Sequence, residues 1–129
     1  MAARSKSDAD AVLVRIAAHC PTDFVVWGFA GDRLTLRGGR DSGGWRDLEI
    51  VFDDVIYMGL PVYLSTVTIR LAEDAARAAL IEVCDCDPAN DTFHVFELIE
   101  DDDWPQGRKI HRVAAEAIHV RAPAPDDTA

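Results

Sequence analysis

The sequence predicts an α+β fold, in which an N-terminal helix packs on a mainly antiparallel sheet of about seven strands. One stretch near the N-terminus has apolar residues at helical spacing, while several later segments alternate apolar and polar residues as strands do. Short polar turns join these segments, which is typical of an antiparallel meander. We expect the sheet to be strongly bent or barrel-like, because closure protects edge strands.

The length and composition indicate a single domain. A chain of 129 residues can enclose one hydrophobic core, and a hydrophobic content of 49% argues against wholesale disorder. No internal repeat and no composition change marks a second domain. The predicted organisation is a flexible N-terminus over residues 1–6, one α+β domain over residues 7–121 and a disordered tail, rich in Pro and Asp, over residues 122–129.

The helix is predicted over about residues 8–19. Ser7 stands where an N-cap is expected, and acidic residues follow it in the first turn, beside the positive helix end. The helix should end at Cys20, because Pro21 disfavours helical geometry in the residue before it. The apolar stripe consists of Val12, Leu13, Ile16 and Ala17.

Two strands joined by a tight turn are expected next. Residues 23–30 are almost continuously apolar, which is typical of a strand covered on both faces. The pair Gly31-Asp32 favours a two-residue hairpin turn. Residues 33–37 then alternate apolar and polar side chains, with Leu34 and Leu36 expected to face inward. The glycines within residues 38–44 indicate a flexible loop.

The segment over residues 45–57 shows the clearest strand pattern. Its apolar residues alternate with mixed ones, so one face of the strand is apolar. After the pair Asp53-Asp54 the alternation resumes one step out of phase, which indicates a β-bulge or a tight bend. The residues expected to face inward are Leu48, Ile50 and Phe52.

The second half of the chain is predicted to be mainly strand. Residues 63–71 are rich in β-branched side chains that fit a pleated surface, and the alanine-rich residues 72–79 favour a short helical turn. Alternation on both sides of a turn-forming stretch at residues 87–91 predicts a hairpin over about residues 79–99. Two further strands are expected over residues 108–113 and 117–121.

The net charge disfavours two classes of partner. Thirteen Lys and Arg against 23 Asp and Glu give a net charge of −10. Such a surface repels nucleic acids and anionic membranes and attracts a basic protein. No apolar run approaches the roughly 18 residues that a membrane span needs. The N-terminal stretch does not fit a secretion signal, because Asp8, Asp10 and Arg15 interrupt its apolar residues. An odd number of cysteines also favours a reducing compartment. We therefore expect a cytoplasmic protein.

Cys84, Cys86 and His94 form the best candidate metal site. In a strand the two cysteines would project to the same face, but zinc favours four sulfur or nitrogen ligands and the sequence offers three. Free thiols are the simpler interpretation. The oxygen-rich turn over residues 85–91 lacks the glycine and the bidentate glutamate of an EF-hand loop. The sequence therefore predicts no cofactor.

Candidate nucleophile–base pairs would combine Cys20 or Cys84 with a histidine, but no local pattern supports any of them. The chain has no nucleophile elbow, no phosphate-binding loop and no dinucleotide glycine pattern. These absences argue against an enzyme. The histidines considered are His19, His94, His111 and His119.

The acidic tract between Arg77 and Arg108 is the feature that best indicates a function. It contains no Lys or Arg, and a basic partner would relieve the repulsion among its carboxylates. Trp104 follows the last acids directly, and aromatic residues often anchor protein interfaces. We therefore expect a non-catalytic protein-interaction module of a bacterial cytosol, such as an immunity-type inhibitor of a basic enzyme. The predicted partner site is Glu97, Glu100, Asp101, Asp102, Asp103 and Trp104.

Two alternative functions fit the same fold. One is binding of a small ligand in the mouth of the bent sheet, lined by aromatic side chains. The other is a structural domain that forms oligomers, for example a homodimer through its sheet edges. The aromatic residues considered for the mouth are Trp27, Phe29, Phe52 and Tyr57.

Overall fold

The computed structural model describes residues 5–18, 23–39, 48–84, 93–102 and 107–121. These residues form two helices and one sheet of seven antiparallel strands, in the order β4-β1-β2-β3-β7-β6-β5. The predicted α+β class and number of strands are confirmed. The elements are α1 (Lys6–Ala18), β1 (Asp23–Ala30), β2 (Arg33–Gly39), β3 (Leu48–Gly59), β4 (Tyr63–Leu64), β5 (Val67–Leu71), α2 (Asp74–Cys84), β6 (His94–Asp102) and β7 (Gly107–Arg121).

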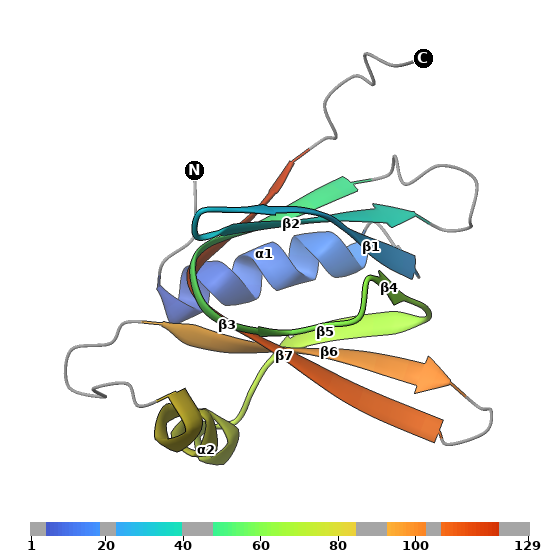
Figure 1. The fold of residues 1–129 in the computed structure, drawn as a ribbon. Helices are drawn as coiled ribbons and strands as arrows, with labels where there is room; N and C mark the ends of the chain where they lie inside the picture. The colour runs from blue at the N-terminus through green and yellow to red at the C-terminus, as the bar shows by residue number, and fades with distance from the viewer. Residues whose placement is uncertain (1–4, 19–22, 40–47, 85–92, 103–106, 122–129) are drawn as a thin grey trace.

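The sheet curls into a half-barrel around α1 (Figure 1). The long strands β3 and β7 bend around the helix, so that β1 and β2 lie on one side of it and β5 and β6 on the other. The second helix, α2, lies outside the curl, beside the start of β6. The concave side of the sheet is therefore occupied by a helix of the chain itself.

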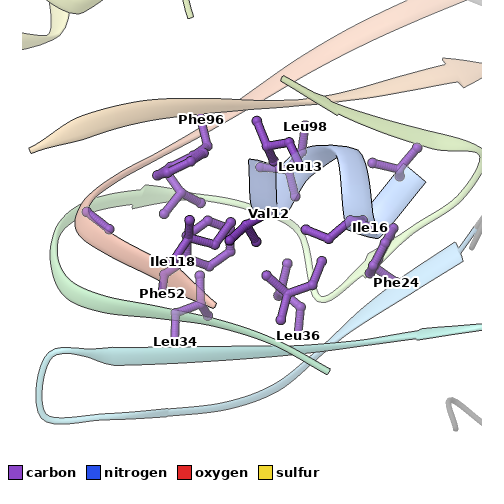
Figure 2. Packing of buried hydrophobic residues seen from close by; sticks show 14 of the residues in the cluster. Val12, Leu13, Ile16, Phe24, Leu34, Leu36, Phe52, Phe96, Leu98 and Ile118 are labelled. Carbon is purple, nitrogen blue, oxygen red and sulfur yellow. The ribbon is translucent and has the colours of Figure 1, made fainter. Parts of the chain in front are cut away.

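The core forms between the apolar stripe of α1 and the inner face of the sheet (Figure 2). The rings of Phe52 and Phe96 meet edge to face at its centre, with centroids 5.2 Å apart. The residues that the alternation of β2 and β3 predicted to face inward are all buried: Leu34, Leu36, Leu48, Ile50 and Phe52.

Helix α1 begins earlier than the sequence indicated. The Ser5 hydroxyl accepts a hydrogen bond from the Asp8 backbone N–H at 3.1 Å, so the N-cap is Ser5 and not Ser7. Val12, Leu13 and Ile16 are buried as predicted, but Ala17 is exposed. Ala9, one turn earlier than Val12, completes the buried stripe.

The bend in β3 occurs where the phase of the sequence pattern slips. Asp54 has a left-handed backbone with φ 54°, and the register between β3 and β7 shifts between Val55 and Tyr57. The facing strand β7 is continuous, so the prediction of separate strands over residues 108–113 and 117–121 was wrong. Alanines of low strand propensity suggested a break, but pairing with β3 holds them in the sheet.

The prediction of a hairpin over residues 79–99 was also wrong, because residues 79–84 continue α2. The alanine-rich run has high helix propensity, and Leu80 is buried against the outer face of the sheet, beside Phe93 and Val95. Strand β6 consequently pairs with β5 and β7. The strand expected over residues 63–71 is interrupted at Thr66, which has φ 52°.

Strand β1 is not covered on both faces, contrary to the prediction. Trp27 and Phe29 are 51% and 48% exposed. Among the described elements, α2 covers β6 and β7 on the outside of the sheet and does not reach β1. The apolar run of β1 is therefore buried on its inner side, at Phe24, and exposed toward its end.

Gly38 lies within β2, although the sequence placed it in a flexible loop. It is paired with Phe24 of β1, and a Cβ atom at Gly38 would lie 2.7 Å from Cε1 of that ring. The absence of a side chain at Gly38 thus makes room for a fully buried phenylalanine. The rest of the predicted loop, residues 40–44, and the predicted tail over residues 122–129 lie outside the described residues.

We predict that Gly38→Ala lowers the free energy of unfolding by about 1–3 kcal/mol, because the new methyl group forces the Phe24 ring out of its position. Gly28→Ala in the neighbouring strand is the matched control: its Cβ meets no atom within 4 Å. The control should change stability by less than about 0.5 kcal/mol. Urea denaturation followed by circular dichroism measures both, and equal stabilities would contradict the packing constraint.

Candidate functional site

The outer face of the sheet carries two ladders of ion pairs, each with a glutamate between two arginines. In the first, which we call the Glu49 ladder, Glu49 of β3 accepts hydrogen bonds from Arg37 of β2 at 2.9 Å and from Arg121 of β7 at 2.6 Å. The three residues stand directly opposite one another in the register of the sheet. The ladder therefore ties three strands together through one buried carboxylate.

Trp27 extends the Glu49 ladder to a fourth strand. The register between β1 and β2 shifts around Trp27, which marks a β-bulge at this residue. The Arg37 guanidinium lies 4.0 Å from the centroid of the Trp27 ring, so the indole covers the cation. Trp27 thus has a structural contact in spite of its exposure.

The second ladder is built in the same way around Glu97 of β6. Arg70 of β5 and Arg112 of β7 reach the two oxygens of its carboxylate at 2.9 and 3.1 Å. Both arginines are about half exposed, whereas Glu97 is 4% exposed. We call this set the Glu97 ladder.

The residues of the predicted partner site do not all face solvent. Glu97 is buried between the two arginines of its ladder. Glu100 accepts a hydrogen bond from the Ser65 backbone N–H at 3.0 Å and lies 2.7 Å from Nε2 of His111. It therefore supports the break between β4 and β5. Asp101 is solvent-exposed, with Arg108 at 3.5 Å. The Asp102 side chain, Asp103 and Trp104 lie outside the described part of the chain.

We predict that Glu97→Gln lowers the free energy of unfolding by about 2 kcal/mol, because the variant loses charge-assisted hydrogen bonds to two arginines. Asp101→Asn removes one negative charge from the same strand but breaks only a solvent-exposed pair. Its cost should stay below about 0.5 kcal/mol. Urea denaturation compares the two variants, and a Glu97→Gln protein as stable as wild type would show that the ladder contributes little.

Of the three candidate metal ligands, only His94 has a side chain among the described residues. Cys84 ends helix α2, so the argument that a strand places it on one face with Cys86 was wrong. Cys20, Cys86 and the turn over residues 85–91 lie outside the described residues. Among the described residues, no three or more His, Cys, Asp or Glu side chains lie close enough to hold a metal ion.

The described histidines occupy separate positions on the sheet. His94 packs edge-on against Phe96, with ring centroids 6.4 Å apart, and His111 contacts Glu100. His119 of β7 is mostly buried, with its Nδ1 3.4 Å from the Asp53 carboxylate. No described residue forms a hydrogen bond with this nitrogen.

Burial lowers the pKa of His119 because it disfavours the charged imidazolium. Asp53 opposes this shift by attracting the cation, whereas Arg121 and Arg33 add to the lowering of the pKa. The folded protein thus binds a proton at this ring less readily than the unfolded chain does. The contribution of His119 to stability is therefore greatest at pH values above the ordinary pKa of histidine. This contribution is lost as the pH falls.

We predict that His119→Gln makes the free energy of unfolding less sensitive to pH between about pH 7 and about pH 5. In the wild type the unfolded chain takes up the His119 proton first, so stability falls as the pH drops through this range; the variant has no ring to protonate. Urea denaturation at several pH values measures the slope. A slope as steep in the variant as in the wild type would contradict the role of His119.

The four aromatic residues considered for a ligand mouth do not line one cavity. Phe52 is fully buried in the core, while Trp27 and Phe29 lie exposed on β1. Tyr57 lies at the end of β3, where it contributes with Val83 of α2 to a groove of about 260 Å³ on the outside of the sheet.

A larger cavity, of about 460 Å³, lies elsewhere and was not predicted from the sequence. Its lining includes Lys6 of α1, Arg77 of α2 and His94 of β6, which are far apart in the chain. We call it the α1–α2 cavity. Of these three residues, only His94 was a candidate from the sequence, as a metal ligand and as a base for a cysteine nucleophile, and no spacing rule joins it to the other two.

No family model, curated protein or solved structure matches this chain in a comparison with known proteins. Neither described helix is long and apolar enough to cross a membrane.

Proposed function

We propose that this chain is a non-catalytic protein-interaction domain that binds a basic partner protein. The observation that carries the proposal is where the negative charge lies. The most buried carboxylates, Glu49 and Glu97, are each paired with two arginines, so much of the net charge of −10 belongs to acids outside the ladders. Six exposed acids form no ion pair with any described residue: Asp8, Asp10, Asp32, Glu73, Asp74 and Glu82.

The proposed docking site is the acidic end of β6, where the tract leaves the sheet. Asp101 is 56% exposed there, and Asp102 and Asp103 follow it in the sequence. Their carboxylates attract Lys and Arg of a partner, and Trp104, the next residue in the sequence, supplies an aromatic anchor. Glu97 and Glu100 contribute indirectly, by holding β5, β6 and β7 together.

Two of the described histidines lie beside carboxylates. His111 is engaged by Glu100, and His119 is mostly buried beside Asp53. An immunity-type inhibitor that covers a basic enzyme is the concrete form of the proposal. Formation of a homodimer stays a prediction; its sheet edges would be β4 and β5.

We predict that replacing Asp101, Asp102 and Asp103 by Asn weakens binding of a basic partner about tenfold, because each exposed ion pair contributes about 0.2–1 kcal/mol. The partner is captured from lysate on the wild-type protein at low ionic strength and identified by mass spectrometry. Its dissociation constant is then measured by calorimetry. Binding should also weaken as salt is added.

The matched control replaces Asp8, Asp10 and Glu82 by the corresponding amides. It removes the same three charges from exposed positions on α1 and α2 that form no ion pair with described residues. The control should retain most of the affinity. If both triple variants bind alike, only the net charge is recognised and the docking site is wrong. If neither loses affinity, attraction to a basic partner is wrong.

A further inference from the structure

A smaller cavity, of about 200 Å³, lies at the open side of the half-barrel. The residues that line it come from α1, β1 and β5 (Figure 1). Strands β1 and β5 lie toward opposite edges of the sheet and, in the described part of the chain, do not pair with each other. The cavity therefore lies where the sheet does not close, and α1 borders it from within the curl. We call it the α1–β5 cavity.

The lining of the α1–β5 cavity is apolar. None of its described residues carries a charge, although 28% of the residues in the chain are charged, and Thr68 is the one described lining residue with a polar side chain. A charged occupant would lose its hydration there without gaining a partner of opposite charge, so the lining favours a neutral apolar occupant. Four of the lining residues belong to the buried core: Leu13, Ile16, Phe24 and Val67.

The cavity is accessible from solvent and has a defined capacity. Ala17 of α1 and Thr68 of β5 line it and are both exposed, so a small molecule can enter beside them without unfolding of the core. A cavity of about 150 Å³ with aliphatic and aromatic walls is large enough to hold benzene. In proportion, about 200 Å³ gives room for about eight carbon atoms.

An apolar molecule fills such a cavity better than water does. A buried water molecule typically makes about three hydrogen bonds, and this lining offers few partners for them. An alkyl chain has no such requirement, and each methylene group that it moves out of water strengthens binding about fourfold. The affinity for an alkyl chain should therefore grow with its length until the cavity is full.

We infer that the α1–β5 cavity binds the neutral apolar part of a small molecule, namely an alkyl chain of about six to eight carbon atoms. The chain packs between Leu13 and Ile16 of α1 and Val67 and Ile69 of β5, beside the Phe24 ring. Its polar end stays in solvent beside Ala17 and Thr68, the exposed lining residues. The site uses none of the acidic residues of the proposed docking site at the end of β6 and is independent of it.

The test is a titration of the full chain with the straight-chain primary alcohols from n-butanol to n-decanol, followed by ¹H–¹⁵N NMR. The alcohols should shift the backbone amide signals of residues 13–17 and 67–69 saturably. The affinity should rise about fourfold per methylene group and level off at about eight carbon atoms. The terminal diol of the same length as n-octanol should bind at least about tenfold more weakly, because one hydroxyl group would be buried without a partner.

Three results would each overturn the proposal. The first is an absence of saturable shifts. The second is an affinity that rises without a limit up to n-decanol, as in unspecific partitioning. The third is equal binding of n-octanol and its diol.

Variants test the place of the site. Ala17→Phe puts a ring at an exposed position in the cavity lining and should weaken binding of n-octanol at least about tenfold. Ala11→Phe is the matched control, because Ala11 is also exposed on α1 but does not line the cavity. The control should bind as the wild type does. Equal binding by the two variants would contradict the proposed site.

A third variant changes the capacity of the cavity. Ile69→Ala removes part of its wall, so the chain length at which the affinity levels off should increase by about two carbon atoms. A general disturbance of the fold would instead weaken binding of every alcohol alike. An unchanged length dependence in Ile69→Ala would therefore refute the site, whatever the effect of Ala17→Phe.

Discussion

The curl of the sheet around α1 is the constraint on which the rest of the structure depends. A seven-stranded antiparallel sheet buries its inner face only if something fills its concave side, and here a helix of the chain itself does so. The bend at Asp54 turns β3 around the helix, and β7 follows it with a register shift between Val55 and Tyr57. Phe52 and Phe96, from strands on opposite sides of the bend, then meet at the centre of the core.

Because α1 fills the concave side of the sheet, the ion pairs and the charged side chains lie on the outer face and at the ends of the half-barrel. On the outer face, Glu49 and Glu97 are buried, and each is paired with two arginines. Acids that the sequence shows as one tract therefore divide into two kinds. Some join strands, and others, such as Asp101, face solvent where a partner can reach them. The same curl brings the starts of α1, α2 and β6 together around the α1–α2 cavity.

Local patterns predicted the elements well where tertiary contacts agree with them. The alternation of β2 and β3, the phase slip at Asp54 and the apolar stripe of α1 are each read from neighbouring residues. The errors arose where two preferences compete. Residues 79–84 alternate like a strand but are helical, because Leu80 gains a buried contact in that form. Within the predicted partner site, Asp101 is exposed, as the charge of the acidic tract indicated. Glu97 is buried, which the acidic tract did not indicate.

The sequence by itself determined the fold class, the approximate number of strands, the inner face of β2 and β3 and the excess of negative charge. These properties depend on composition and on spacing within a few residues. Only the tertiary structure decided which charges meet. Arg70, Glu97 and Arg112 become neighbours through the pairing of β5, β6 and β7, and Lys6, Arg77 and His94 through the closure of the curl. No local pattern encodes these neighbours, because strand register and the direction of a bend are set by packing of the whole core.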